Sequence, residues 1–71
     1  MHISAEKLRE LREERAYSLR GLARVSGVAY NTVLHIEHGQ EEVWPRTVRR
    51  LAEALGVEPR VLQGSKMPED G

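Results

Sequence analysis

The chain contains no cysteine among its 71 residues, so no disulfide bond, thiolate metal site or thiol nucleophile is available to it. Its three histidines do not occur in a spacing typical of a metal site, and we expect neither a metal nor a cofactor. A domain of this length buries only about 60% of the surface that its unfolded chain exposes. Its stability must therefore come from helix packing, with dimerisation as a further source.

Long apolar runs and net charge are also lacking. No segment approaches the roughly 20 apolar residues of a membrane span, and the first four residues do not form a secretory signal pattern. We therefore expect a cytoplasmic protein without a membrane partner. The formal net charge is zero, which argues against binding through a broad positive field. Nine of the eleven basic residues are arginine, a side chain suited to bidentate phosphate and carboxylate contacts.

Catalytic motifs are missing as well. The chain has no glycine-rich phosphate loop and no nucleophile–base pair at a recognisable spacing. His35 and Glu37 are two residues apart, so on a helix they face different directions. A chain this short also has little room for a closed active site. The sequence therefore argues against an enzyme.

Apolar residues recur at helical spacing and predict an all-α fold. The five expected helices run from about 4 to 15, 19 to 25, 30 to 38, 45 to 55 and 58 to 63. Ser4 and Ser18 are candidate N-caps, and Pro45 suits a first helical turn. The fourth helix has the strongest stripe, formed by Val48, Leu51, Ala52 and Leu55. We expect residues 1–63 to form one domain and 64–71 a flexible tail.

The second and third helices are separated by a short turn that contains Gly27, which is typical of a helix-turn-helix. Val28, Val33 and Ile36 are expected to anchor the third helix from below. The N-terminal half of this helix is then left exposed, with free backbone N–H groups that suit a DNA groove. Its expected exposed residues are Ala29, Tyr30, Asn31, Thr32 and His35.

The ordered set of apolar, glycine and charged positions resembles one known family. The set reads Leu8-x-x-Leu11-Arg12, Leu22-Ala23, Gly27-Val28, Val33, Ile36-Glu37-x-Gly39, Pro45-x-Thr47-Val48-x-x-Leu51-Ala52-x-Ala54-Leu55-Gly56-Val57 and Val61-Leu62. It is similar to the helix-turn-helix family of phage repressors, Cro proteins and small bacterial relatives. The resemblance implies a compact, lambda-repressor-like bundle of five short helices that binds double-stranded DNA as a sequence-specific transcriptional regulator.

The resemblance also implies residue roles. Arg12 is expected to form a partly buried structural ion pair with Glu37. The positions that touch bases in the family fall on Tyr30, Asn31 and His35, with Ala29 and Thr32 at the edge. Asn31 is suited to an adenine edge, His35 to a guanine acceptor, and Tyr30 to a phosphate or a thymine methyl group. An ordinary solvated helix face is the alternative for these side chains.

Phosphate contacts are expected from the arginines Arg20, Arg24, Arg46 and Arg49, with Arg50 as a further candidate. Solvated surface charges are the alternative for each. Two features depart from the family pattern. Leu19 stands where relatives often have a polar residue, and Glu41 and Glu42 lie in a loop where relatives often have basic residues.

A two-fold homodimer is expected, because relatives commonly dimerise through the C-terminal end. Its candidate contact residues are Trp44, Val57, Val61 and Leu62. Trp44 has an alternative place in the core beside Pro45. We expect no small-molecule effector, because 71 residues leave no room for a second domain that would bind one.

One function other than DNA binding is the alternative. The zero net charge, Leu19, Glu41 and Glu42 are the features that favour a protein-interaction module with weak or no DNA affinity. Among DNA-binding proteins of this size, the sequence does not distinguish phage regulators from restriction–modification controllers or antitoxins. Salt-dependent retention on DNA separates the interaction module from the regulators.

Overall fold

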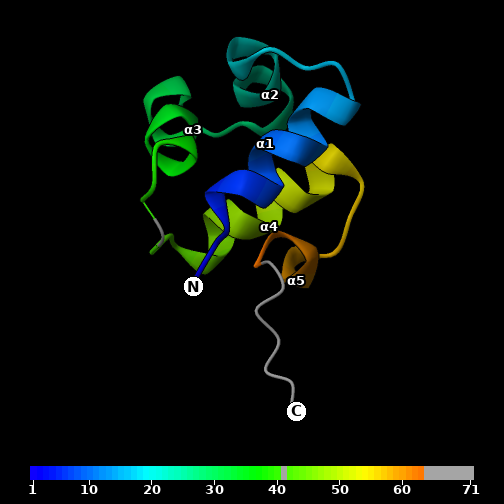
Figure 1. The fold of residues 1–71 in the computed structure, drawn as a ribbon. Helices are drawn as coiled ribbons and strands as arrows, with labels where there is room; N and C mark the ends of the chain where they lie inside the picture. Colours follow the sequence, from blue (N-terminus) through cyan, green and yellow to red (C-terminus); the bar gives the residue numbers. More distant parts are fainter. Residues whose placement is uncertain (41, 64–71) are drawn as a thin grey trace.

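The computed structural model describes residues 1–40 and 42–63 (Figure 1). Its five helices are α1 (Ala5–Glu14), α2 (Leu19–Ser26), α3 (Tyr30–Glu37), α4 (Pro45–Leu55) and α5 (Pro59–Leu62). The all-α fold and the number of helices are therefore confirmed for these residues. The expectations of a flexible tail over 64–71 and of charge repulsion at Glu41 lie outside the described residues.

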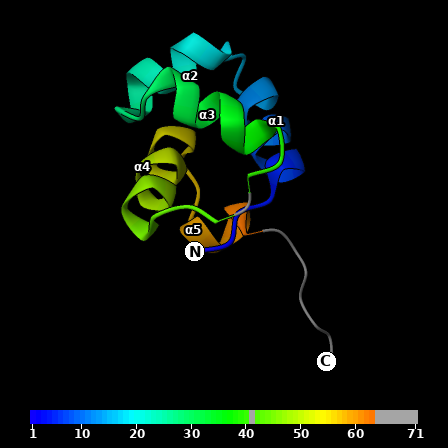
Figure 2. The same ribbon diagram turned by 90° about the vertical axis from the view of Figure 1, so that its left-hand side faces the viewer.

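The helices pack around a single core (Figure 1). α2 packs against α3 and α4, while α1 contacts α3 and α5. α5 closes the lower end of the bundle by packing on α4. When the molecule is turned by 90°, α3 faces the viewer between α1 and α4, so one long side of this helix is open (Figure 2). None of the described helices is long and apolar enough to cross a bilayer.

Local signals at the helix ends explain the helix boundaries. The Ser4 hydroxyl accepts a hydrogen bond from Lys7 N at 3.1 Å, and that of Ser18 accepts one from Gly21 N at 2.9 Å. Pro45 begins α4, where its missing N–H costs nothing. Gly27 ends α2 with a φ of 77°, a left-handed conformation that a side chain disfavours. The predicted helix ends differ from those in the structure by at most one residue, and both ends of α4 match.

The core is built from the apolar stripes of the helices. Its fully buried larger side chains are Ile3, Leu8, Leu22, Val33, Ile36, Val48, Leu51, Leu55 and Leu62. Burying a side chain of this kind contributes about 1.5–3 kcal/mol relative to leaving it in water. The core therefore supplies the main stabilising term in a chain that has no disulfide bond.

An extended N-terminal segment completes the core, and the sequence did not predict it. His2 forms an isolated antiparallel bridge with Glu42, and Val43 N donates to the Met1 carbonyl at 3.0 Å. The next residue on the inner side, Ile3, is fully buried. Ser4 N donates to the Leu62 carbonyl at 2.8 Å, which connects this segment to α5. The chain start thus closes the lower side of the bundle.

Two expectations about large apolar residues are corrected. Trp44 does not fill the core beside Pro45; 79% of its surface is exposed, while its neighbour Val43 is buried. Leu62, expected at a dimer surface, is fully buried within its own chain and has no surface to offer a second copy. Val57 and Val61 pack against the core and remain half-buried.

Candidate nucleic-acid interface

The open side of α3 carries polar side chains. Val33, Ile36 and Glu37 face the core, whereas Asn31 and His35 are exposed. Asn31 and His35 are four residues apart, so their side chains lie on the same face of the helix. Of the five side chains expected to face DNA, Ala29, Asn31 and His35 are exposed, whereas Tyr30 and Thr32 are partly buried.

The first turn of α3 has no side-chain cap. Ala29 occupies the N-cap position, and its methyl group offers no acceptor for the backbone N–H groups that follow. Tyr30 is the first helical residue, and its ring is half-buried. The guanidinium carbon of Arg20, on α2, lies 4.8 Å from the centroid of this ring. A cation–π contact therefore connects the starts of the two helices.

Ser26 shapes the turn between α2 and α3, a role that the sequence reading missed. Its side chain is buried, and its hydroxyl accepts a hydrogen bond from Val28 N at 3.2 Å. The same hydroxyl donates to the Ala23 carbonyl at 3.4 Å. A serine followed by glycine at a predicted helix end is the signal that indicates such a local bond. The Ser26 side chain is therefore bonded to the residues before and after the turn, which fixes the direction of α3 relative to α2.

The structure contains the ion pair expected between Arg12 and Glu37. Arg12 Nε donates to Glu37 Oε2 at 2.6 Å, and Nη2 donates to Oε1 at 3.1 Å. The side chains are only 13% and 5% exposed. Arg12 Nη1 also donates to the Tyr17 carbonyl at 2.8 Å. This geometry ties the end of α3 to α1 and to the segment that leads into α2.

The charge of Arg12 is stabilised by its partner. The hydrogen bond with Glu37 raises the pKa of Arg12 above its ordinary value, although burial opposes this. Arg9 approaches the same carboxylate less closely, with Nε at 3.8 Å from Oε1 and half of its side chain exposed. Glu37 is thus a buried structural anchor, and its charge is not available to repel a phosphate.

Although the net charge is zero, paired and unpaired arginines are distributed unevenly over the described helices. Arg9, Arg12 and Arg15 on or beside α1 all lie within ion-pairing distance of a glutamate. Another set of arginines, on α2 and α4, is exposed and forms no ion pair with a described carboxylate: Arg20, Arg24, Arg46, Arg49 and Arg50. These include every arginine expected to contact phosphate. The positive charge therefore remains available on the helices that flank α3.

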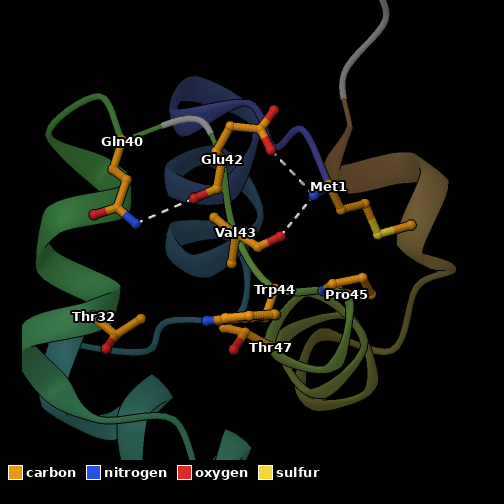
Figure 3. Close-up of a pocket in the computed structure, with 8 residues that line it drawn as sticks. All are labelled: Met1, Thr32, Gln40, Glu42, Val43, Trp44, Pro45 and Thr47. Atoms are coloured by element: carbon orange, nitrogen blue, oxygen red, sulfur yellow. Dashed lines mark hydrogen bonds and ion pairs between the residues drawn. The ribbon is translucent and has the colours of Figure 1, made fainter.

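A groove of about 580 Å³ separates α3 from the start of α4 (Figure 3). It is lined by Met1, Thr32, Gln40, Glu42, Val43, Trp44, Pro45 and Thr47. The nitrogen of the Trp44 indole ring points across it toward Thr32. Thr47 and Gln40 were not among the expected site residues, because only the packing of α4 against the rest of the fold brings them near α3. Exposed Trp44 therefore lies across the groove from Thr32, which is at the edge of the expected base-contact residues.

No metal centre is found in the part of the chain that the structure describes: no three His, Cys, Asp or Glu side chains there are arranged to hold an ion.

Comparison with known proteins assigns this arrangement to a family. The model of the helix-turn-helix domain family matches residues 5–64, which span all five helices. The chain belongs to this family. Proteins of this family are DNA-binding transcriptional regulators, so the fold and the exposed α3 face now have a common explanation.

Individual relatives carry regulatory names. The helix-turn-helix domain is 43% identical over 58 residues to the HTH-type transcriptional repressor RghR of Bacillus subtilis (strain 168). That match covers 80% of this chain but 43% of RghR, so the domain spans under half of that repressor.

Solved structures agree on the architecture. The restriction–modification controller protein C.AhdI of Aeromonas hydrophila superposes with a TM-score of 0.77 and 40% identity, covering 82% of this domain and 88% of C.AhdI. SinR, the master biofilm regulator of Bacillus subtilis, was solved in complex with DNA. Its TM-score is 0.81 at 26% identity, and the match covers 84% of this domain and 97% of the SinR chain in that structure.

Proposed function

We propose that this helix-turn-helix domain is a sequence-specific, repressor-like transcriptional regulator that reads the major groove of DNA with α3. The observation that carries the proposal is the exposed polar face of α3, which is anchored from behind by the Arg12–Glu37 ion pair. The major groove of B-form DNA is wide enough to admit a helix. A rigidly held helix loses little freedom on entering it, which favours binding.

Each exposed side chain on this face has a suitable acceptor or donor on a base edge. The Asn31 amide is able to pair with adenine N6 and N7, and His35 is able to donate to guanine N7 or O6. Tyr30 and Thr32 offer hydroxyl groups at the margin of the same face. Base contacts of this kind give sequence preference, because each base pair has a distinct pattern in the major groove.

Affinity would come from the arginines of α2 and α4. Contacts with phosphate are largely independent of sequence and depend steeply on salt. Arg24 and Arg46 are exposed and have no ion pair with a described carboxylate, so binding to phosphate would break no ion pair within the described residues. Glu42, whose charge argued against phosphate contacts, lies 3.4 Å from the Met1 ammonium group. Its repulsion is thereby reduced at the groove.

The regulator is proposed to act as a homodimer on a palindromic operator, with half-sites about one helical turn apart. A highly exposed tryptophan supports this, since Trp44 is the largest apolar side chain on the surface and tryptophan is enriched in protein interfaces. Val57 and Val61 offer a smaller, half-buried contribution. Leu62 is excluded from this contact by its burial.

The test is selection of binding sites by the purified protein from a random duplex library, followed by affinity measurements at several salt concentrations. Enrichment of a palindrome, with affinity that falls steeply as salt rises, is the expected result. Enrichment of a single half-site would retain the regulator and refute the dimer. No enrichment, with weak binding at low salt only, would refute the proposal and favour the protein-interaction module.

Two variants separate base contacts from phosphate contacts. Asn31→Ala is expected to cost about 1–3 kcal/mol at the selected site and to relax the preference at one base pair. Arg24→Ala is expected to weaken binding to all sequences about equally. Arg60→Ala is the matched control, because Arg60 is also exposed but pairs with Glu58 and belongs to α5, which lies away from α2 and α3 (Figure 1). Wild-type affinity in both Asn31→Ala and Arg24→Ala would refute this docking arrangement.

A further inference from the structure

The contact between Arg20 and Tyr30 joins the first turn of α2 to the first turn of α3. The 4.8 Å separation of the guanidinium carbon from the ring centroid is inside the range of about 6 Å for a cation–π interaction. Arg20 has no ion pair with a described carboxylate. Among the described residues, the ring of Tyr30 is therefore the contact that positions this guanidinium.

Stacking uses the face of a guanidinium and leaves its N–H groups free around the edge. Arg20 is thus able to cover one face of the Tyr30 ring and still donate outward. The covered ring has fewer accessible orientations than a ring in open solvent. Because Tyr30 begins the helix that is proposed to read DNA, its orientation determines where its hydroxyl group and ring edge point.

We propose that Arg20 is a positioning residue for Tyr30 and through it sets the preference for one base pair. The ligand is the major-groove edge of that base pair, which Tyr30 contacts. The inference rests on the proposed function and deepens it. It also differs from the sequence-based expectation, in which Arg20 contacts phosphate alone and affects all sequences alike.

The contact in the free protein is tested by NMR spectroscopy without DNA. In the wild-type protein, the ring current of Tyr30 is expected to shift the side-chain protons of Arg20 upfield. This upfield shift should disappear in Tyr30→Ala. Arg24 is the internal control, since it lies on the same helix and stacks on no described ring. Arg20 proton shifts that do not change on Tyr30→Ala would overturn the inference at its first step.

The effect on DNA is tested by repeating the library selection with four proteins. Tyr30→Ala identifies the base pair that depends on the ring. Arg20→Lys preserves the charge but removes the planar group. It is expected to lower the preference for that same base pair over the other base pairs by roughly tenfold, which lies within the discrimination that one base contact provides. Arg24→Lys is the matched control and should retain this preference. In the Tyr30→Ala background, Arg20→Lys should cause no further loss of it.

The outcomes separate the two proposals. If the wild-type protein selects a sequence and Arg20→Lys weakens all duplexes equally without changing preference, Arg20 is a phosphate contact and the inference is overturned alone. A changed preference at a base pair that Tyr30→Ala does not affect would overturn it as well. If the wild-type protein selects no sequence, the proposed function fails, and this inference fails with it.

Discussion

Replacing Arg12 by methionine tests the buried connection between α1 and α3. The substitution preserves much of the side-chain volume and removes the charge. The Glu37 side chain is only 5% exposed, and Arg9 is the described cation that remains near it. Arg9 Nε lies 3.8 Å from Glu37 Oε1, and half of the Arg9 side chain is exposed to water. The Tyr17 carbonyl also loses its 2.8 Å donor. Removing one partner of a buried pair costs about 3–5 kcal/mol, and the residual Arg9 contact places our expectation near the lower end.

A loss of about 3 kcal/mol is large for this domain, whose expected total stability is about 4–10 kcal/mol at its length. With a urea dependence of about 1 kcal/mol/M, the midpoint of unfolding should fall by about 3 M. Circular dichroism at increasing urea measures this shift. Because pairing raises the pKa of Arg12, its contribution is fully present below the unfolded value and is lost only at pH above it. The wild-type-to-variant difference should therefore stay constant between about pH 7 and about pH 10.

A second ion pair provides the matched control. Arg60 Nε lies 2.9 Å from Glu58 Oε1, a distance close to that of the buried pair, but the side chains are 80% and 69% exposed. Arg60→Met should cost less than about 1 kcal/mol, because water screens exposed charges. The double variant Arg12→Met/Glu37→Met should recover part of the loss, since no unpaired charge remains. Equal costs for Arg12→Met and Arg60→Met would refute the argument from burial.

Two further predictions concern the turn and the groove, and both use the same urea titration. Gly27→Ala should destabilise the domain by about 1–2 kcal/mol, because a φ of 77° strains a residue that has a side chain. The added carbon causes no clash, since the atom that it would meet, Arg50 Nη1, is 3.9 Å away. An unchanged midpoint of unfolding would show that the turn relaxes without cost. Trp44→Ala should change stability by less than about 0.5 kcal/mol and Val43→Ala by about 2 kcal/mol, since only Val43 is buried. A larger loss for Trp44 than for Val43 would contradict the assignment of Val43 to the core.

Local signals made much of the fold predictable. The bounds of α4 match the sequence expectation because Pro45 and Gly56 delimit an apolar stripe of period 3.6. Ser4 and Ser18 cap their helices as expected, because the capping bond joins residues three apart. The face of α3 followed from the same periodicity, which leaves Asn31 and His35 opposite the buried side.

Contacts between residues distant in sequence were harder to predict. Pairing of Arg12 with Glu37 was expected only from the family resemblance, because nothing local connects positions 25 residues apart. The cation–π contact of Arg20 with Tyr30 was not expected, and it depends on the angle at which α2 and α3 meet. The sequence also did not predict that the α2 and α4 arginines form no ion pair with a described carboxylate, since a net charge of zero says nothing of how charges are arranged in space.

The five helices, the Ser4 and Ser18 caps and the apolar stripes follow from the order of residues, because each depends on hydrogen bonds and side chains within a few residues. Which of two adjacent apolar residues is buried depends instead on contacts between distant parts of the chain. Bridging of His2 with Glu42 brings Val43 inward and leaves Trp44 facing the groove. That choice depends on a pairing across 40 residues, whose free energy arises only when the whole core has formed.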